Sequence, residues 1–365
     1  MDDLTSKKDN NLDEITGKSG KKADYFALKA EQESKFLAAK GVSGLETSDP
    51  SQGKKKKFKE TPKFTVKEFK RQWILVVIGA IYVIYGLVFN YAPLVGWIMA
   101  FQNFKYNKGL FKSKFVGLDK FKFLFSDNSF LLVIRNTFAM GVLNLVFSTV
   151  VAIAFAILLN EVRNKYFKKS IQTISYMPHF LSWIIVVAIV HDAVSNTGII
   201  NEILLKLHIV DQPYPFLAKP GWFWPLVTLS HLWKETGWNA IIYLAAITSI
   251  DPCLYESAAI DGAGRFQKMR YVTLPSLRPT IVILLIMNMG NVLNAGFELQ
   301  YLLGNDVVRD VSRTIDIYVL EWAMDGRNMD YSLGTAAGIF KTVVSLVLIV
   351  MANYIAKRKG DERLF

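Results

Sequence analysis

Six long apolar segments constrain the fold of this chain more than any other feature of its sequence. A helix needs about 17–25 residues to cross the ~30 Å hydrocarbon core of a bilayer, and each segment is that long or longer. The segments are residues 73–99, 130–159, 171–193, 222–250, 281–297 and 333–355. Aromatic side chains that favour the headgroup region lie near their ends, namely Trp73, Tyr91, Trp97, Trp222, Trp224 and Tyr354. We therefore expect an all-α membrane protein with six transmembrane helices.

Positive charge gathers before the first of these segments. The 365-residue chain has a net charge of +12, and 17 of its 43 lysine and arginine residues fall within residues 1–72. Basic residues beside a span stay on the cytoplasmic side, so we expect the N-terminus inside and, after an even number of crossings, the C-terminus inside as well. Residues 102–129 argue against this orientation, because their six lysines would lie outside. The lysines beside the first span decide the prediction.

Composition divides the chain into three parts. Residues 1–70 are basic and poor in apolar residues, so we expect a mostly flexible cytoplasmic segment. Residues 71–356 contain the spans as one transmembrane domain, and residues 357–365 form a short cytoplasmic tail. Anionic lipid headgroups account for the lysine cluster at 54–59, so no nucleic-acid partner is expected.

The usual signatures of enzymatic sites are missing from the sequence. A single cysteine, Cys253, excludes an intramolecular disulfide and a cysteine metal site. The histidines lack the spacing of a metal motif; they are His179, His191, His208 and His231. Gly17-Lys18-Ser19 resembles the end of a phosphate-binding loop, but Leu12 stands where that loop needs a glycine. We therefore expect no catalytic residue, no metal site and no ATP hydrolysis in this chain.

The loop 251–275, between the fourth and fifth apolar segments, carries its own helix signals. Asp251 suits an N-cap, Pro252 suits the first helical position, and Gly262 ends the helix about three turns later. Helical spacing places Leu254, Ser257, Ala258 and Asp261 near one face. A second short helix is expected over 265–272, after which Leu274-Pro275 returns the chain to the membrane. A narrow helix of this kind can sit in the groove of a partner.

This loop resembles the cytoplasmic coupling loop of permease subunits of binding-protein-dependent ABC importers. Glu256, Ala258, Gly262, Leu274 and Pro275 match the pattern of that family at the right spacing. Two mild departures are Ser257 in place of an alanine and Val272 in place of an isoleucine. The resemblance covers about residues 70–365. It is strongest to the sugar branch of the family, which contains the maltose-type permeases, and within that branch to permeases for complex oligosaccharides.

The resemblance implies a type I ABC importer permease fold with a cytoplasmic coupling helix, in a bacterial plasma membrane. It implies a transport subunit, not an enzyme, that forms half of a pathway for a carbohydrate, an oligosaccharide by the nearest branch. Its partners would be a second, homologous permease in a heterodimer, two ATPase subunits that hold ATP and Mg, and an extracellular substrate-binding lipoprotein. This chain itself would bind no cofactor. The residues expected to contact the ATPase are Leu254, Tyr255, Glu256, Ser257, Ala258, Asp261, Gly262, Leu274 and Pro275.

Polar residues inside spans are costly and therefore are candidates for the pathway. We predict cargo contacts from Trp238, Asn239, Tyr243, Asn291, Asn294 and Glu298. Lys234, Glu235, Asn288 and Gln300 belong to the same two polar sets, and Asn144 and Trp183 are weaker candidates. The alternative is that such residues join helices, at roughly 1 kcal/mol each. Lys234 and Glu235 are adjacent on a helix, so we expect them to point apart rather than to pair.

Other functions fit the sequence less well. An ion-coupled secondary transporter would need broken helices and an ion site, and it would not need a capped loop helix. A membrane enzyme would need a catalytic constellation near a span. An ABC permease for an amino acid, a polyamine or a phosphate ester stays open as an alternative cargo assignment.

Overall fold

The computed structural model describes residues 72–324 and 329–358. The chain divides into two units, Met1–Val77 and Ile78–Phe365; the start of α3 falls in the first unit, and all later helices belong to the second. The predictions for the basic segment 1–70 and for most of the tail 357–365 fall outside the described residues.

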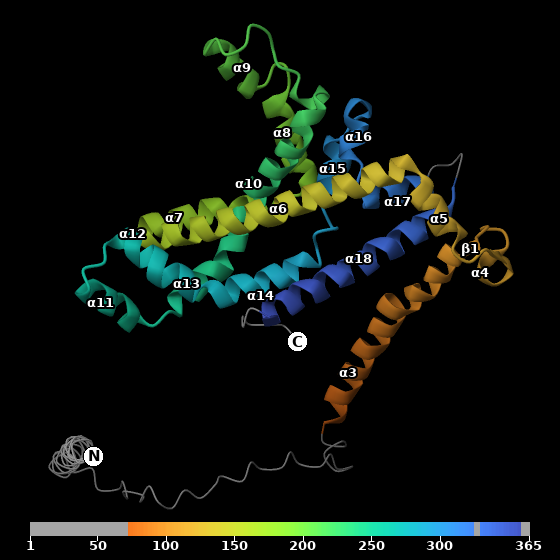
Figure 1. Ribbon diagram of the computed structural model, residues 1–365, viewed down its shortest axis with the longest axis horizontal. Helices are drawn as coiled ribbons and strands as arrows, with labels where there is room; N and C mark the ends of the chain where they lie inside the picture. The colour runs from red at the N-terminus through yellow and green to blue at the C-terminus, as the bar shows by residue number, and fades with distance from the viewer. Residues whose placement is uncertain (1–71, 325–328, 359–365) are drawn as a thin grey trace, which may run out of the picture. The chain divides into compact units, whose positions relative to one another are not determined.

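Every apolar segment contains helix, as the sequence predicts. The helices, in chain order, are α3 (Trp73–Gly86) with η1 (Leu87–Tyr91) and η2 (Ala92–Phe101), α6 (Asn128–Glu161), α7 (Lys165–Tyr176) with η3 (Met177–Phe180) and α8 (Trp183–Val194), α10 (Pro220–Thr248), α14 (Arg278–Met289) and α18 (Tyr331–Arg358) (Figure 1). Within the described residues, four helical stretches are long and apolar enough to cross a membrane, or up to five if a pair bent by 54° before and after Leu277 counts as one. The 29-residue α10 is long enough, but polar residues around Lys234 lower its hydropathy.

The third segment was predicted as one helix over 171–193, and this was wrong. Helix α7 begins earlier, at Lys165, and a break at residues 181–182 separates η3 from α8. Pro178 lies in η3, and Ser182 caps α8 by accepting from the Ile185 amide at 3.4 Å. A proline followed by an N-cap serine indicates that one helix ends and another begins. The prediction from overall apolar composition did not take this local signal into account.

The fifth segment ends eight residues before the predicted boundary at 297, because α14 stops at Met289. The chain then passes through turns over 290–297 and reenters a helix at α15 (Glu298–Leu303). Two glycines and two asparagines follow Met289 in this stretch, and Gly296 has a φ of 100°, which disfavours other residues. These turns bring polar side chains beside α6.

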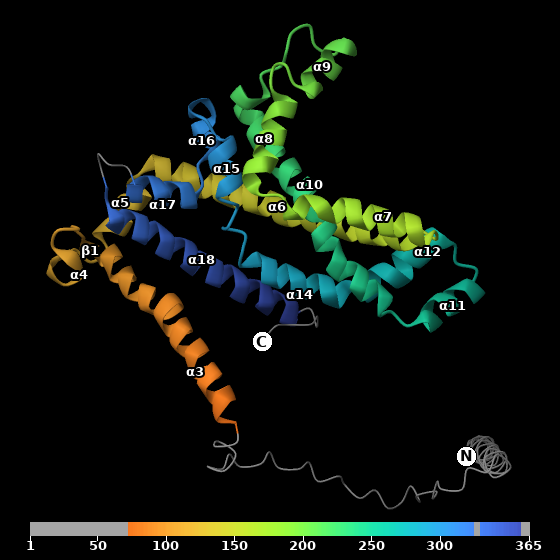
Figure 2. The same ribbon diagram turned by 180° about the vertical axis from the view of Figure 1, so that it is seen from behind.

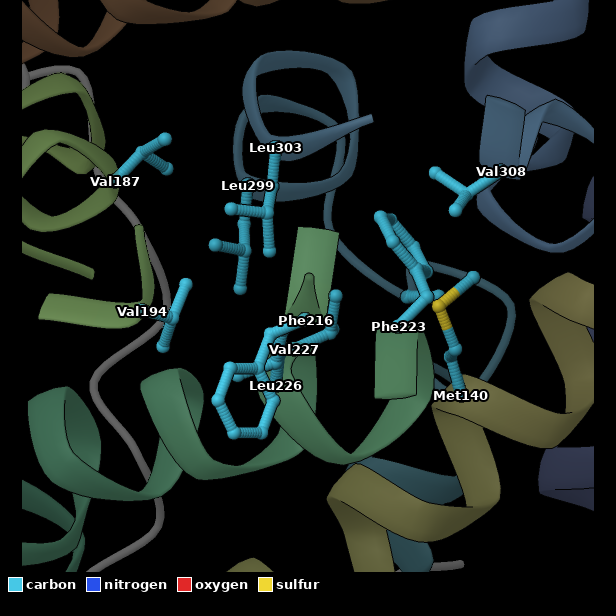
Figure 3. Packing of buried hydrophobic residues seen from close by; sticks show 11 residues of the cluster. Met140, Val187, Val194, Phe216, Phe223, Leu226, Val227, Leu299, Leu303 and Val308 are labelled. Carbon is cyan, nitrogen blue, oxygen red and sulfur yellow. The ribbon is translucent and has the colours of Figure 1, made fainter. Parts of the chain in front are cut away.

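Helices α6 and α10 pack side by side along much of their length. Ala152 and Ala156 of α6 meet Ala240, Tyr243 and Ile247 of α10 in a buried cluster. Small residues allow such close helix contact in membranes. A second cluster joins α10 to α8 and α15, with Met140, Phe223 and Val308 meeting at its edge (Figure 3).

The loops at the two ends of α6 differ in structure. Near its N-terminus lie a hairpin, short helices and the segment before α18: β1 (Gln102–Asn103), α4 (Gly109–Lys112), β2 (Lys114–Phe115), α5 (Asp119–Ser126), η6 (Asp306–Val308), α16 (Arg309–Ser312) and α17 (Ile315–Met324). Near its C-terminus lie α11 (Pro252–Ile260), α12 (Arg265–Lys268), η5 (Met269–Thr273) and α13 (Leu274–Ser276). Figures 1 and 2 show α17 and α11 at opposite ends of α6. The short hairpin β1–β2 was not predicted from the sequence.

The loop 194–221 joins α8 to α10. It contains α9 (Ile199–Lys206) and η4 (Phe216–Ala218). Asn201 is fully buried and donates to the carbonyls of Ser195 and Tyr214 at 2.8 and 3.0 Å, while its Oδ1 accepts from the Tyr214 amide at 2.7 Å. One asparagine therefore satisfies the backbone on both sides of the loop.

Candidate functional site

Helix α11 starts and ends where the sequence signals place it. The Asp251 carboxylate accepts from the Cys253 amide at 2.9 Å, and Pro252 occupies the first turn. At the other end Gly262, with a φ of 79°, donates to the Ala259 carbonyl, and Ala263 donates to the Ala258 carbonyl. These two bonds form a Schellman motif, which needs a residue in the left-handed conformation at the position of Gly262. The helix is therefore fixed by local sequence alone.

The loop 251–275 exposes apolar side chains that no part of the described chain covers. Among the described residues, none of the side chains of α11 is buried. Ile260 is 86% exposed and Phe266 is 70% exposed. Tyr255 and Ala258 turn partly toward the rest of the loop, and the Tyr255 hydroxyl lies 3.0 Å from Thr273 Oγ1. Exposed apolar groups of this density mark a surface that another molecule covers.

The residues expected to contact an ATPase lie on both sides of this surface. Leu254, Glu256, Ser257, Asp261 and Gly262 are exposed on or beside α11. Leu274 and Pro275 are exposed in α13. The structure thus brings the whole predicted set together in one loop, although their role as partner contacts stays a prediction.

A polar cavity of about 400 Å³ lies between α6, α10 and the turns after α14. Five asparagine side chains line it, together with two rings and one carboxylate; they are Asn144, Asn239, Asn288, Asn291, Asn294, Trp183, His231 and Glu235. Gly141 of α6 makes the approach of the turns possible, because a Cβ there would collide with the Val292 carbonyl. The amide side chains of the lining can both donate and accept hydrogen bonds, which suits a hydroxyl-rich molecule.

The predicted cargo residues divide into three groups. Asn239, Asn291 and Asn294 line the polar cavity. Glu298 lines an adjoining cavity of about 330 Å³ that shares Trp183 and His231 with the first. Trp238 stacks on His179 and Tyr243 is buried in the α6–α10 packing, and neither residue lines either of these cavities.

Several of the weaker sequence candidates line the polar cavity, unlike Trp238 and Tyr243. Asn144 and Trp183 line the polar cavity. Asn288 is exposed there, whereas Gln300 is fully buried and donates to the Ala295 carbonyl. Ser148 and Thr149 also line it and were missed. The signal that could have found Ser148 is its spacing from Asn144, since residues four apart share a helix face.

Charged groups beside this cavity form a network, and the prediction that two of them would not pair was wrong. Lys234 and Glu235 were expected to point apart, yet Lys234 Nζ lies 3.2 Å from Glu235 Oε1. The other oxygen of Glu235 lies 2.7 Å from His179 Nδ1, and Lys234 also donates to the His179 carbonyl at 2.5 Å. Both side chains bend toward η3 because it supplies the partners that buried charges need. The lysine stem is long enough to reach round the helix.

The long apolar helices, the polar cavity between them and the uncovered loop helix define a membrane transport protein. Residues 144–361 match the family described as binding-protein-dependent transport system inner membrane component. The chain belongs to this family and is therefore a permease component of a transport system, not an enzyme. Among residues 72–324 and 329–358, no group of three histidine, cysteine, aspartate or glutamate side chains could hold a metal ion.

Curated relatives of similar length agree with this assignment. The chain is 41% identical to the protein LplB of Bacillus subtilis (strain 168), over 82% of this chain and 92% of the relative. It is also 41% identical to YteP of the same organism, a polygalacturonan/rhamnogalacturonan transport system permease, over 81% of this chain and 90% of the relative. The resemblance to sugar-branch permeases is thereby confirmed.

Solved structures confirm the permease fold. A bacterial ABC transporter involved in import of the acidic polysaccharide alginate matches with a TM-score of 0.72 and 38% identity, over 80% of this chain and 98% of that one. A bacterial alginate ABC transporter in complex with its pentasaccharide-bound periplasmic protein matches with a TM-score of 0.74 and 37% identity, over 82% and 99%.

Proposed function

We propose that this chain is one of two permease subunits of an ATP-driven ABC importer for an oligosaccharide in the bacterial plasma membrane, with both termini cytoplasmic. Its partners are a second, homologous permease, two ATPase subunits that hold ATP and Mg, and an extracellular substrate-binding lipoprotein. Membrane lipids surround it. The observation that carries the proposal is the fixed but uncovered helix α11 in a loop of the right spacing.

Helix α11 transmits motion because it is rigid at both ends. Its caps hold the helix without help from the rest of the chain, and Tyr255 joins it to η5, which leads through α13 into α14. A partner that grips α11 therefore pulls on α14 and, through the short link at Ser249, on α10. A few kcal/mol of differential contact between two states of the ATPase is enough to shift the permease from one state to the other.

The polar cavity supports a carbohydrate as cargo. Asparagine amides offer paired donors and acceptors to sugar hydroxyls, and Trp183 offers a ring face. The named cargoes of relatives, such as polygalacturonan and alginate, are carbohydrates as well. A non-sugar cargo is the second candidate, but the titratable side chains on the cavity wall are only His231 and Glu235, and Glu235 is already paired.

The test is cargo-stimulated ATP hydrolysis by the assembled transporter in nanodiscs. The Gly262→Leu variant should insert and assemble but lose the stimulation, because leucine at a positive φ is strained and disrupts the end of α11. Gly338→Leu is the matched control, because no described atom lies within 4 Å of a Cβ there either and its φ is ordinary. Full stimulation in Gly262→Leu, or transport driven by an ion gradient without the ATPase subunits, contradicts the proposal.

A further inference from the structure

A third cavity, of about 630 Å³, lies at the end of α6 that is away from α11. It is named the outer cavity here, and its walls come from the start of α6, from α15 and from α16–α17. The side chains that matter are Tyr301, Arg309, Arg313, Tyr318, Glu321 and Trp322. Helix α6 has 34 residues and so is about 50 Å long, which separates the outer cavity from α11 by the thickness of a membrane. The side opposite the ATPases is the side from which cargo arrives.

Two arginines in the outer cavity share one carboxylate. Arg309 Nη2 lies 3.2 Å from Glu321 Oε1, and Arg313 binds Glu321 Oε2. Each guanidinium has five N–H donors, so one carboxylate cannot satisfy both groups. Among the described residues, the buried Nε of Arg313 has no hydrogen-bond partner. The Arg309 side chain is 55% exposed and open to a further anion.

The remaining carboxylate of the outer cavity is already engaged. Asp127 caps α6 by accepting from the Ser129 amide at 2.9 Å, and its other oxygen accepts from the Tyr318 hydroxyl at 3.4 Å. Burial raises the pKa of Tyr318 to about 12, so this hydroxyl keeps its proton at neutral pH. Both oxygens of Asp127 are thus occupied, and among the described residues it forms no ion pair with either arginine, so the two guanidinium groups share only Glu321.

Aromatic rings lie beside these arginines. Tyr301 is half-exposed, Trp322 lies in the wall, and the Arg313 guanidinium is 5.3 Å from the centre of the Tyr318 ring. Rings bind the C–H faces of sugars, and arginine is suited to planar, two-point recognition of a carboxylate. A sugar that carries a carboxylate satisfies both features at once, whereas a neutral sugar leaves the arginine donors unpaired.

We propose that the outer cavity binds an acidic oligosaccharide, with a uronate carboxylate on Arg309 and Arg313 and a sugar ring on Trp322 or Tyr301. This rests on the proposed function and narrows its cargo to acidic sugars. The site would hold the chain end between its release by the binding protein and its entry into the polar cavity. That cavity has Glu235 and no cation on its wall, so the selection for charge takes place in the outer cavity.

The outer cavity is preformed rather than assembled by the ligand. Asn136 of α6 is fully buried and donates to the carbonyls of Asp310 and Arg313 at 2.8 and 3.1 Å. The hydroxyl of Thr137 accepts from the Ile315 amide at 2.9 Å. The backbone that carries both arginines is therefore fixed to α6, which lowers the entropy lost on binding.

The experiment uses the full chain, co-purified with its partner subunits in nanodiscs of zwitterionic lipid, and calorimetric titration with trigalacturonate. Fully methyl-esterified trigalacturonate is the matched neutral probe. We expect the acid to bind at least tenfold more tightly than the ester and to weaken as salt rises. Arg309→Gln should weaken binding of the acid roughly tenfold or more and leave the ester unchanged. Arg163→Gln, an exposed arginine near the other end of α6, is the control for loss of charge.

Four results would overturn the inference. Equal affinity for acid and ester would show that the arginines do not read charge, and so would an unchanged affinity in Arg309→Gln. Loss of acid binding when the nanodiscs contain anionic lipid would assign the arginines to a lipid headgroup. ATP hydrolysis that is stimulated only by neutral sugars would contradict the acidic-sugar site but would leave the proposed importer function intact. If no sugar stimulates ATP hydrolysis but trigalacturonate still binds through Arg309, the proposed importer function is contradicted and the acidic-sugar site is supported.

Discussion

His179 Nδ1 lies 2.7 Å from Glu235 Oε2, and the His179 ring stacks on Trp238 at 4.3 Å between ring centres. This pair joins the break between α7 and α8 to the wall of the polar cavity, because His179 belongs to η3 and Glu235 lines the cavity. A change at the cavity wall therefore reaches the helix break through one carboxylate. Lys234 holds the same break through the His179 carbonyl.

The first prediction concerns Lys234, whose side chain is only 6% exposed. Lys234→Met should destabilise the protein by about 3 kcal/mol, because it leaves Glu235 and the His179 carbonyl buried without their cation. The measurement is an unfolding titration in detergent with increasing denaturing surfactant. Lys206→Met is the control, since Lys206 makes an exposed pair with Glu202 on α9, and it should not move the midpoint. Equal midpoints for the two variants would mean that the buried network contributes nothing.

The second prediction separates cargo contact from structure in the asparagine-rich turns. Asn288 is exposed on the polar cavity and makes no side-chain hydrogen bond within the described residues, so Asn288→Ala should leave stability unchanged and raise the KM for uptake about threefold to tenfold. Gln300→Ala should do the opposite, because Gln300 is fully buried and donates to the Ala295 carbonyl. Uptake by liposomes, measured beside thermal unfolding, checks both. An unaltered KM in Asn288→Ala would remove this residue from the pathway.

The third prediction concerns the buried amide that fixes the outer cavity. Asn136→Ala removes the donor to the Arg313 carbonyl and one of the two donors to the Asp310 carbonyl, which keeps only Arg135, and it should cost about 2 kcal/mol of stability. Backbone amides of residues 309–315 should exchange with deuterium faster, while those of α10 stay protected. Asn103→Ala, at an exposed position in the hairpin, is the control and should change neither quantity. Unchanged exchange over 309–315 would show that α6 does not hold this segment.

Local signals explain what the sequence could predict. Asp251, Pro252 and Gly262 act on their own neighbours, so the bounds of α11 follow from residue types alone. The boundary of α14 needed only attention to Gly290 and Asn291, which sequence reasoning passed over in favour of overall apolarity. The pairing of Lys234 with Glu235 could not be predicted, because it depends on η3, more than fifty residues away along the chain. The same holds for Trp238, whose partner His179 is set by packing.

The last prediction tests how α7 lies on α10. A Cβ at Gly237 of α10 would collide with the Ser175 carbonyl of α7, so the two helices touch backbone to backbone there. Gly237→Ala should push α7 away from α10 and destabilise the protein by about 1–3 kcal/mol. It should also disturb the His179–Glu235 pair, because Glu235 lies two residues before Gly237 on α10. The readout is the unfolding midpoint together with cargo-stimulated ATP hydrolysis.

Gly221 on the same helix provides the matched control for this test. No described atom lies within 4 Å of a Cβ at Gly221, so Gly221→Ala should be neutral or raise the stability by up to about 1 kcal/mol through helix propensity. A midpoint that rises in both variants would show that α7 yields to the extra methyl group. In that case the contact between α7 and α10 would not be what positions the charged network beside the polar cavity.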